Sequence, residues 1–236
     1  MQQGARGGQT SPTSSAPARI AARPSAPSEP GAPGLQTLAS GGRRDGLLYV
    51  PRGYRADRPA PLAVMLHGAG GDARGGLVPF LDLADQAELI LLAPTSRRQT
   101  WDLLMGGYGP DVTVINRALR QTFARYAVDA ARVAVEGFSD GASYALSVGI
   151  TNGDLFRDVI AFSPGFMAPD GEVGRPRIYV SHGIHDAVLP IDLCSRRIVP
   201  ELRHAGYDVT YQEFDGPHLV PPEIAREALA WFLRPR

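Results

Sequence analysis

The stretch Arg132-Val-Ala-Val-Glu-Gly-Phe-Ser-Asp-Gly-Ala142 decides the fold of this chain. Its first half is short and apolar, which is typical of a buried strand, and its second half is the motif Gly137-Phe-Ser-Asp-Gly141. The apolar residues that follow predict a helix over residues 139–151. Three fixed residues in five occur often by chance, but between a strand and a helix they indicate a serine nucleophile, Ser139, on a tight turn.

The two glycines of the motif explain why it needs these residue types. A turn that lifts a hydroxyl above a sheet is so tight that side chains at Gly137 and Gly141 would clash. The helix that begins at Ser139 directs its partial positive charge at that hydroxyl, where it would stabilise developing negative charge. The alternative is that Ser139 only caps the helix after a glycine turn.

Short apolar runs alternate with longer amphipathic segments along most of the chain. In the segment 112–126, apolar residues recur at helical spacing, with Arg117 and Arg120 on the opposite side. Buried strands that alternate with helices predict an α/β fold, in which helices cover both faces of a mostly parallel sheet. The predicted strands are 46–50, 62–66, 89–92, 133–135, 159–162, 178–181 and 209–214, and the other predicted helices are 76–87, 193–204 and 221–233.

Composition excludes several classes of protein. The 24 basic and 24 acidic residues balance, which argues against a nucleic-acid binder, and every basic residue is Arg. The single cysteine, Cys194, excludes an intramolecular disulfide framework and a cysteine-rich zinc site. No apolar run approaches the roughly 20 residues that a membrane-spanning helix needs. Asn occurs only at positions 116 and 152, a bias that we attribute to a GC-rich coding sequence.

The first 42 residues differ in composition from the rest. Of these, 27 are Gly, Ala, Pro or Ser, and only four are larger apolar residues. Such a segment buries too little apolar surface to offset its ordering entropy, so residues 1–42 are predicted to be a disordered or linker-like tail and 43–236 the folded domain. Residues 34–40 are the part that could dock. The tail lacks the apolar region of a signal peptide, so we expect a soluble protein, either cytoplasmic or exported with its signal peptide already removed.

A serine hydroxyl needs a general base, and the base needs an acid that orients it. In this type of sheet the three residues follow in the order serine, acid, histidine. Asp186 follows the predicted strand 178–181 and His218 follows the strand 209–214, so both lie where α/β sheets place their sites. We predict that His218 is the base and Asp186 the acid. Asp215, three residues before His218, is the alternative acid.

Two further histidines flank the predicted acid. His182 and His185 are interpreted as structural residues that form hydrogen bonds within the loop. A metal site made by His182, His185 and Asp186 is the alternative, but three ligands from one short loop, without a second cluster, argue against it. We therefore predict no metal site.

A glycine-rich loop, His67-Gly-Ala-Gly-Gly-Asp72, follows the predicted strand 62–66. Attack on a carbonyl creates an oxyanion, which two aimed N–H groups stabilise strongly. We predict that the amides of Ala69 and Asp140 form this oxyanion hole, with Gly70 as the next candidate. A phosphate-binding loop is the alternative, but the P-loop motif is not in the sequence and a chain without Lys cannot make it.

The residues that would contact a substrate are less readable. The segment 95–110 is predicted to lie on the rim of the site, and it contains two aromatic candidates for substrate binding, Trp101 and Tyr108. Packing of the loop onto the domain is the alternative for Trp101. Further candidates for the wall of the site are Phe166, Leu189 beside the acid, and Leu219 beside the base.

The motifs at His67–Gly71, Gly137–Gly141 and His182–Pro190, followed by His218, resemble in order those of the α/β-hydrolase superfamily. More narrowly, residues 46–234 resemble small bacterial serine esterases of the phospholipase/carboxylesterase or polyhydroxybutyrate-depolymerase-like type. The resemblance implies a single-domain α/β-hydrolase fold without a large lid, acyl-enzyme chemistry, no cofactor and a small-molecule ester substrate. Asp140 departs from the pattern, because relatives often carry a neutral residue there. Its carboxylate either disfavours anionic acyl groups or points away and binds the next loop.

These motifs predict a serine-dependent carboxylic ester hydrolase with the triad Ser139, Asp186 and His218. A thioesterase or lysophospholipase would use the same triad. A non-catalytic binding protein with an α/β-hydrolase-like fold usually lacks one of the three residues, and all three are present here. The oligomeric state does not follow from the sequence.

Overall fold

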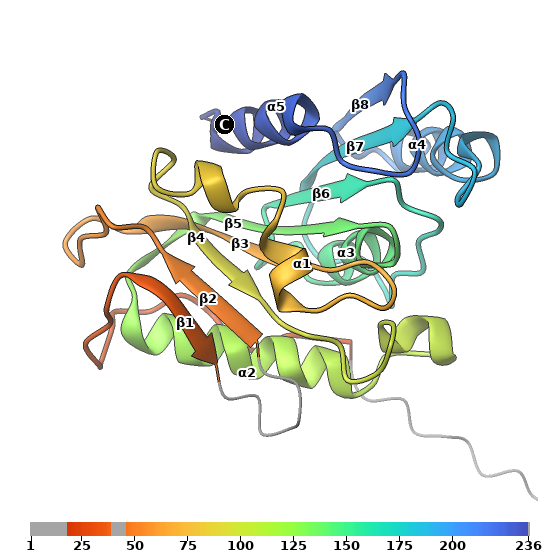
Figure 1. Cartoon of the computed structure of the whole chain (residues 1–236). Helices are drawn as coiled ribbons and strands as arrows, with labels where there is room; N and C mark the ends of the chain where they lie inside the picture. Colours follow the sequence, from red (N-terminus) through yellow and green to blue (C-terminus); the bar gives the residue numbers. More distant parts are fainter. Residues whose placement is uncertain (1–17, 39–45, 236) are drawn as a thin grey trace, which may run out of the picture.

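Strand β5 (Val128–Phe138), which ends at the predicted nucleophile, lies in the middle of the sheet (Figure 1). The computed structural model describes residues 18–38 and 46–235, and within these ranges the sheet has eight strands in the order β1-β2-β4-β3-β5-β6-β7-β8. Strand β2 pairs antiparallel with β1 and β4, and the remaining pairs are parallel. The predicted α/β fold with a mostly parallel sheet is therefore confirmed. The other strands are β1 (Gly34–Leu38), β2 (Gly46–Val50), β3 (Ala60–Leu66), β4 (Ile90–Ala93), β6 (Asp158–Phe162), β7 (Arg177–Gly183) and β8 (Val209–Phe214).

Helices cover both faces of the sheet, and the alternation of side chains along each strand explains the division. In β5, Val133 and Val135 point into one apolar core, whereas Ala134 points into the other. The first core receives side chains from α2, α3 and α4, and the second receives them from α1 and α5. The helices are α1 (Ala73–Leu77), α2 (Pro110–Arg125), α3 (Asp140–Thr151), α4 (Ser195–His204) and α5 (Pro222–Leu233).

Helix α1 is shorter than predicted and begins earlier. Asp72 caps it, since its Oδ1 accepts the amides of Arg74 and Gly75 at 2.9 and 3.1 Å. The helix ends at Leu77, because Pro79 has no N–H to continue it. Only a short 3₁₀ turn at Leu81–Leu83 follows, so the prediction of one helix over 76–87 is wrong.

The N-terminal segment is the main departure from the predicted organisation. Residues 18–38 lie against the rest of the molecule, although the whole of 1–42 is predicted to be disordered or linker-like. Ala18, Ile20 and Ala22 are buried in the core beside α2 and α3, and β1 pairs with β2 at one end of the sheet (Figure 1). The prediction for residues 1–17 and 39–42 lies outside the described residues.

Both asparagines of the chain hold this segment in place, which explains why so polar a stretch is ordered. Asn116 Oδ1 accepts the amides of Ala21 and Ala22 at 3.0 and 2.9 Å. Asn152 accepts the Ile20 amide at 2.8 Å and donates to the Ala18 carbonyl at 3.0 Å. A segment with few apolar side chains is thus fixed mainly through its backbone, a contribution that hydropathy does not measure.

The sheet brings the predicted site together. Strands β3, β5, β7 and β8 are parallel, so their carboxyl ends lie at the same edge. The glycine-rich loop follows β3, Ser139 follows β5, Asp186 follows β7 and His218 follows β8. Four segments that are far apart in the sequence therefore converge on one place.

Candidate active site

Ser139 lies at the turn between β5 and α3 in a backbone conformation that L-residues rarely adopt, with φ 57° and ψ −119°. A Cβ on Gly137 would lie 2.1 Å from the Gly141 carbonyl oxygen, and one on Gly141 would lie 2.1 Å from that of Leu66. Only glycine fits at either position. The close approach of these segments forces the turn, and the turn exposes the Ser139 side chain above the sheet.

The three predicted catalytic side chains form a continuous hydrogen-bonded chain. Ser139 Oγ lies 2.9 Å from His218 Nε2, and His218 Nδ1 lies 2.5 Å from Asp186 Oδ2. The ring of Phe138 packs against the His218 imidazole with centroids 4.7 Å apart. This is the geometry in which a histidine can accept the serine proton at one nitrogen while a carboxylate fixes the other.

Asp186 is held as an anion in this arrangement. Burial alone would raise the pKa of its carboxyl, but the Leu189 amide and the His218 ring more than offset burial, so the pKa lies below its usual range. Oδ1 accepts the amides of Val188 and Leu189 at 2.9 and 2.8 Å, and Oδ2 faces His218. Both oxygens therefore have defined partners.

The alternative acid, Asp215, points elsewhere. Its side chain is 86% exposed, and its Oδ1 lies 2.9 Å from Nε2 of His185, which is 67% exposed. His185 and Asp215 form a surface pair, whereas His182 is fully buried behind Asp186. The two histidines lie on different sides of the loop, and no cluster of metal-ligating side chains occurs among the residues that the structure describes.

The glycine-rich loop lies directly beside Ser139. A Cβ on Gly68 would lie 3.5 Å from the Ser139 Cβ, so the loop closes over the serine. The amide of Gly70 donates to the Gln99 carbonyl at 2.6 Å, and Gly70 is therefore wrong as an oxyanion donor. Asp140 is the first residue of α3, whose first-turn amides have no helical acceptor. The amides of Ala69 and Asp140 remain the two candidate donors.

The Asp140 carboxylate points away from Ser139 and toward the rim. Its Oδ2 accepts a hydrogen bond from Thr100 Oγ1 in the loop that follows β4. Of the two interpretations of this departure from the family pattern, binding of the neighbouring loop is the one that the structure supports. Thr100 is a partner that sequence spacing gave no reason to single out.

Trp101 is wrong as a substrate-binding residue because it is buried, whereas Tyr108 is buried except for 8% of its surface. Trp101 is 1% exposed, donates from Nε1 to the His67 carbonyl at 2.9 Å and stacks on Tyr144 with centroids 5.1 Å apart. Tyr108 donates to the Ala168 carbonyl at 2.9 Å. Both aromatic side chains support the loops around the site, and Tyr108 also lines a pocket of about 570 Å³ that the rim segment forms.

The rim loop is held by carboxylates as well. Asp111 lies in the first turn of α2, which follows the rim segment. Its oxygens accept the amides of Arg97 and Asp102 at 2.7 and 2.9 Å. Burial raises the pKa of Asp111 to about 6, although the Arg97 amide opposes the shift.

The remaining wall candidates differ in position. Phe166 and Leu189 are half-buried on loops that follow β6 and β7. Leu219 is 41% exposed and lines, with His218, a cavity of about 460 Å³ between the α1 region and α5. Most of the other side chains around this cavity are apolar, and no sequence pattern singles them out because they come from separate segments. They include Val78, Pro79, Leu83, Phe138 and Val220.

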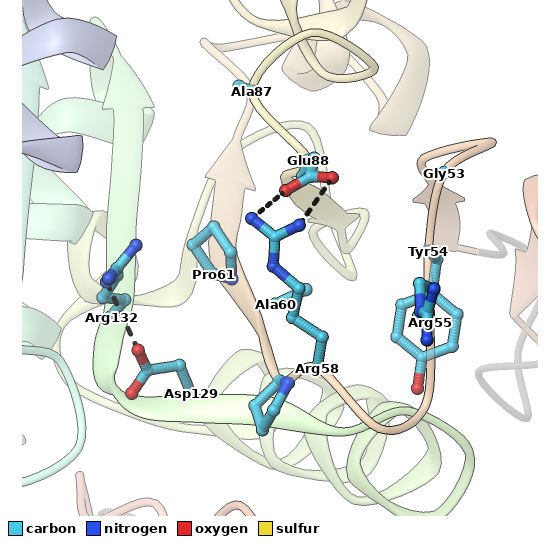
Figure 2. A pocket seen from close by; sticks show the side chains of 11 residues that line it. Gly53, Tyr54, Arg55, Arg58, Ala60, Pro61, Ala87, Glu88, Asp129 and Arg132 are labelled. Carbon is cyan, nitrogen blue, oxygen red and sulfur yellow. Dashed lines mark hydrogen bonds and ion pairs between the residues drawn. The ribbon is translucent and has the colours of Figure 1, made fainter.

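A second pocket, of about 250 Å³, lies at the other end of the sheet, beside the amino-terminal ends of β3 and β5 (Figure 2). Arginines approach it, but each has a carboxylate partner, so positive and negative groups balance and we assign no ligand to it. The pairs are Arg55 with Asp57 and, as drawn in Figure 2, Arg58 with Glu88 and Arg132 with Asp129.

Comparison in sequence places this chain beside fungal esterases. No protein-family model matches it. Over 157 residues it is 29% identical to a probable feruloyl esterase C of Aspergillus flavus, an alignment that covers 63% of this chain and 57% of the relative. The chain thus spans little more than half the length of the curated relatives that it matches.

Comparison in structure identifies the fold. A phospholipase/carboxylesterase from Dyadobacter fermentans superposes with a TM-score of 0.62 at 18% identity, covering 87% of this chain and 98% of the other. A ferulic acid esterase from Anaeromyces mucronatus gives 0.59 at 17% identity, covering 84% and 88%. The chain has the α/β-hydrolase fold, and the proteins that it resembles include esterases and S-formylglutathione hydrolases. In the part that the structure describes, no helix is both long and apolar enough to cross a membrane.

Proposed function

We propose that this protein is a serine-dependent carboxylic ester hydrolase that works through an acyl-enzyme. The observation that carries the proposal is the chain of contacts from Ser139 Oγ to His218 Nε2 at 2.9 Å and from His218 Nδ1 to Asp186 Oδ2 at 2.5 Å. Two features add support: the strained turn at Ser139, and the esterases among the related proteins.

The proposed cycle follows from these contacts. His218 Nε2 accepts the Ser139 proton as Oγ attacks the ester carbonyl, and the amides of Ala69 and Asp140 stabilise the oxyanion. His218 then protonates the leaving alcohol, and the acyl group stays on Ser139. A water molecule, deprotonated by His218, attacks the acyl-enzyme carbonyl, and His218 then gives that proton to Ser139 Oγ as the acid is released. Asp186 keeps the imidazole in one tautomer and stabilises its charged form.

We further propose that the substrate is an ester with an aryl or other bulky apolar group, such as a ferulate ester. The cavity beside His218 supports this, because its volume of about 460 Å³ is within the range of ligand sites and its walls are largely apolar. Feruloyl esterases also occur among the sequence relatives and the structural neighbours. One structural neighbour is described as a phospholipase/carboxylesterase, which is one of the two types that the sequence resembles.

Hydrolysis of p-nitrophenyl acetate by the wild type and three variants tests the mechanism. We expect Ser139→Ala to lower kcat roughly 1000-fold or more, and Asp186→Asn roughly 100-fold or more. Asp215→Asn is the matched control and should stay within about twofold of the wild type, because Asp215 is exposed and pairs with His185. Equal rates for wild type and Ser139→Ala would exclude the mechanism, and a large loss in Asp215→Asn would overturn the choice of acid.

The substrate class is tested with esters that share a leaving group. Methyl ferulate should have a higher kcat/KM than methyl acetate, although conjugation makes its carbonyl less reactive, because the apolar cavity binds the larger group. A short thioester and a lysophospholipid in the same panel separate the ester hydrolase from the two alternatives that use the same triad. Preference for either of these over every oxygen ester of a small alcohol would reassign the activity.

A further inference from the structure

Behind Asp186 lies a second imidazole that the proposed mechanism does not use. His182 is in β7, four residues before Asp186, and its side chain is fully buried. Its Nε2 lies 2.8 Å from the Leu189 carbonyl oxygen and 3.2 Å from Asp186 Oδ2. Both of these oxygens only accept hydrogen bonds, so Nε2 must carry a proton.

The other nitrogen of His182 is fixed by a serine. Nδ1 lies 2.5 Å from the hydroxyl oxygen of Ser195, the buried first residue of α4. Burial lowers the pKa of His182, although the Leu189 carbonyl and Asp186 oppose the shift. In the neutral ring Nδ1 is an acceptor, so the Ser195 hydroxyl donates to it. Ser195 thereby selects the tautomer that presents N–H to Asp186.

Asp186 Oδ2 consequently faces two imidazole nitrogens, one from His182 and one from His218. A carboxylate with only the two loop amides on Oδ1 could still rotate or tilt Oδ2 away from His218. The neutral N–H of His182 fixes Oδ2 without adding a positive charge, so the negative charge of Asp186 stays available to His218.

We propose that His182, held in one tautomer by Ser195, is a positioning residue that orients Asp186 for the catalytic histidine. The hydrogen-bonded chain then extends from Ser195 through His182, Asp186 and His218 to Ser139. The kinetic consequence of this inference rests on the proposed function. Its geometric consequence, a defined contact between His218 and Asp186, is independent of that function.

Kinetics of His182 variants form the first test, with p-nitrophenyl acetate as the substrate. His182→Phe keeps the ring and removes both nitrogens, and we expect kcat to fall roughly 10-fold with KM within about twofold of the wild type. His182→Gln can place an amide N–H near the position of Nε2 and should recover most of the loss. His185→Phe is the matched control, because it removes an exposed imidazole three residues away, and should change neither constant.

The second test reads the His218–Asp186 contact directly. The proton between His218 Nδ1 and Asp186 Oδ2 should give a low-field ¹H NMR resonance, because the two atoms lie 2.5 Å apart. We expect this resonance to broaden or move upfield in His182→Phe and to remain in His182→Gln and His185→Phe. If His182→Phe does not fold, Ser195→Ala should show the same spectral change with about a threefold lower kcat.

The outcomes separate the two proposals. An unchanged resonance and an unchanged kcat in folded His182→Phe, or in Ser195→Ala, would overturn the positioning role even if Ser139→Ala abolishes turnover. Activity that survives Ser139→Ala would overturn the proposed function, while the NMR comparison would still decide whether His182 orients Asp186.

Discussion

Glu136 is a buried carboxyl three residues before Ser139, on the face of β5 that packs against α1 and α5. Its neighbours in the adjacent strands are Met65 and Ile160. Neither carboxyl oxygen has a hydrogen-bond partner among the residues that the structure describes. Burial raises its pKa well above the usual range, because an unpaired carboxylate in an apolar core costs much free energy.

This single residue should give the protein a pH-dependent stability. The folded state binds the Glu136 proton more tightly than the unfolded chain does. The contribution of Glu136 to the unfolding free energy is therefore full below the unfolded pKa of about 4.3. It is lost as pH rises toward the folded pKa, by up to about 1.4 kcal/mol per pH unit. Glu136→Gln should remove this loss, so the unfolding free energy of the variant should increase relative to that of the wild type as pH rises from 5 to 8.

Urea unfolding at several pH values measures the effect. The difference in unfolding free energy between Glu136→Gln and wild type should grow with pH. Glu88→Gln, at a glutamate whose side chain is 45% exposed and paired with Arg58, is the control and should show no such growth. If the unfolding free energies of Glu136→Gln and the wild type change in parallel with pH, the Glu136 carboxyl must have a hydrogen-bond partner or a bound water in the folded state.

At the scale of elements, the loop after β4 supports both candidate oxyanion donors. Gln99 accepts the Gly70 amide, Thr100 binds the Asp140 carboxylate, and Trp101 donates to the His67 carbonyl. These consecutive residues therefore contact the glycine-rich loop on either side of Ala69 and the first residue of α3. The position of the oxyanion hole depends on this loop although none of the three residues supplies a donor to it.

Trp101→Phe tests this support. The variant removes the hydrogen bond that Trp101 donates to the His67 carbonyl, which should lower the unfolding free energy by about 0.5–1.5 kcal/mol. Because the glycine-rich loop is less well placed, kcat for p-nitrophenyl acetate should fall several-fold with little change in KM. Trp231→Phe in α5 is the matched control, far along the sequence and in the other core, and should affect stability alone. Equal kcat values in the two variants would show that the loop does not position the oxyanion hole.

At the scale of the whole molecule, residues 18–38 extend the folded domain beyond residues 43–236, the range that the composition of the sequence predicts. The docked segment spans α2 and α3 and then adds β1 to the sheet. Surface ion pairs of Arg19 and Arg23 with Asp154 accompany the asparagine contacts. We infer that the folded unit begins before residue 43, with the segment as an integral part of it.

Asn152→Ala measures how much this docking contributes. The variant leaves the Ile20 amide and the Ala18 carbonyl without their partner, and we expect the unfolding free energy to fall by about 1–3 kcal/mol. Asp154→Asn weakens only exposed ion pairs and should cost at most about 1 kcal/mol. Thermal unfolding compares the two, and a Tm for Asn152→Ala as high as that of Asp154→Asn would show that the segment adds little.

Local sequence was sufficient for much of the fold. The extents of β2 and β8 are as predicted, and those of α2, α3, α4 and α5 differ from the predictions by one or two residues at one or both ends. These elements combine a clear apolar period with a turn residue or proline at their ends. The prediction of a helix over 76–87 failed because two glycines and Pro79 interrupt the helical pattern. Strand β1 was not predicted because pairing with β2, and not its own composition, makes this segment a strand.

The sequence by itself determined the α/β architecture and the order in which serine, acid and histidine occur, because both follow from patterns within about ten residues and from the direction of parallel strands. Only the tertiary structure decided that Gly70 is already bonded to Gln99, that Trp101 is buried, that Asp186 rather than Asp215 faces His218, and that Ser195 and His182 lie behind it. Each of these depends on which hydrogen-bond partner arrives from another segment of the chain. Periodicity carries no information about such partners, because a buried polar group is satisfied by whatever the fold brings beside it.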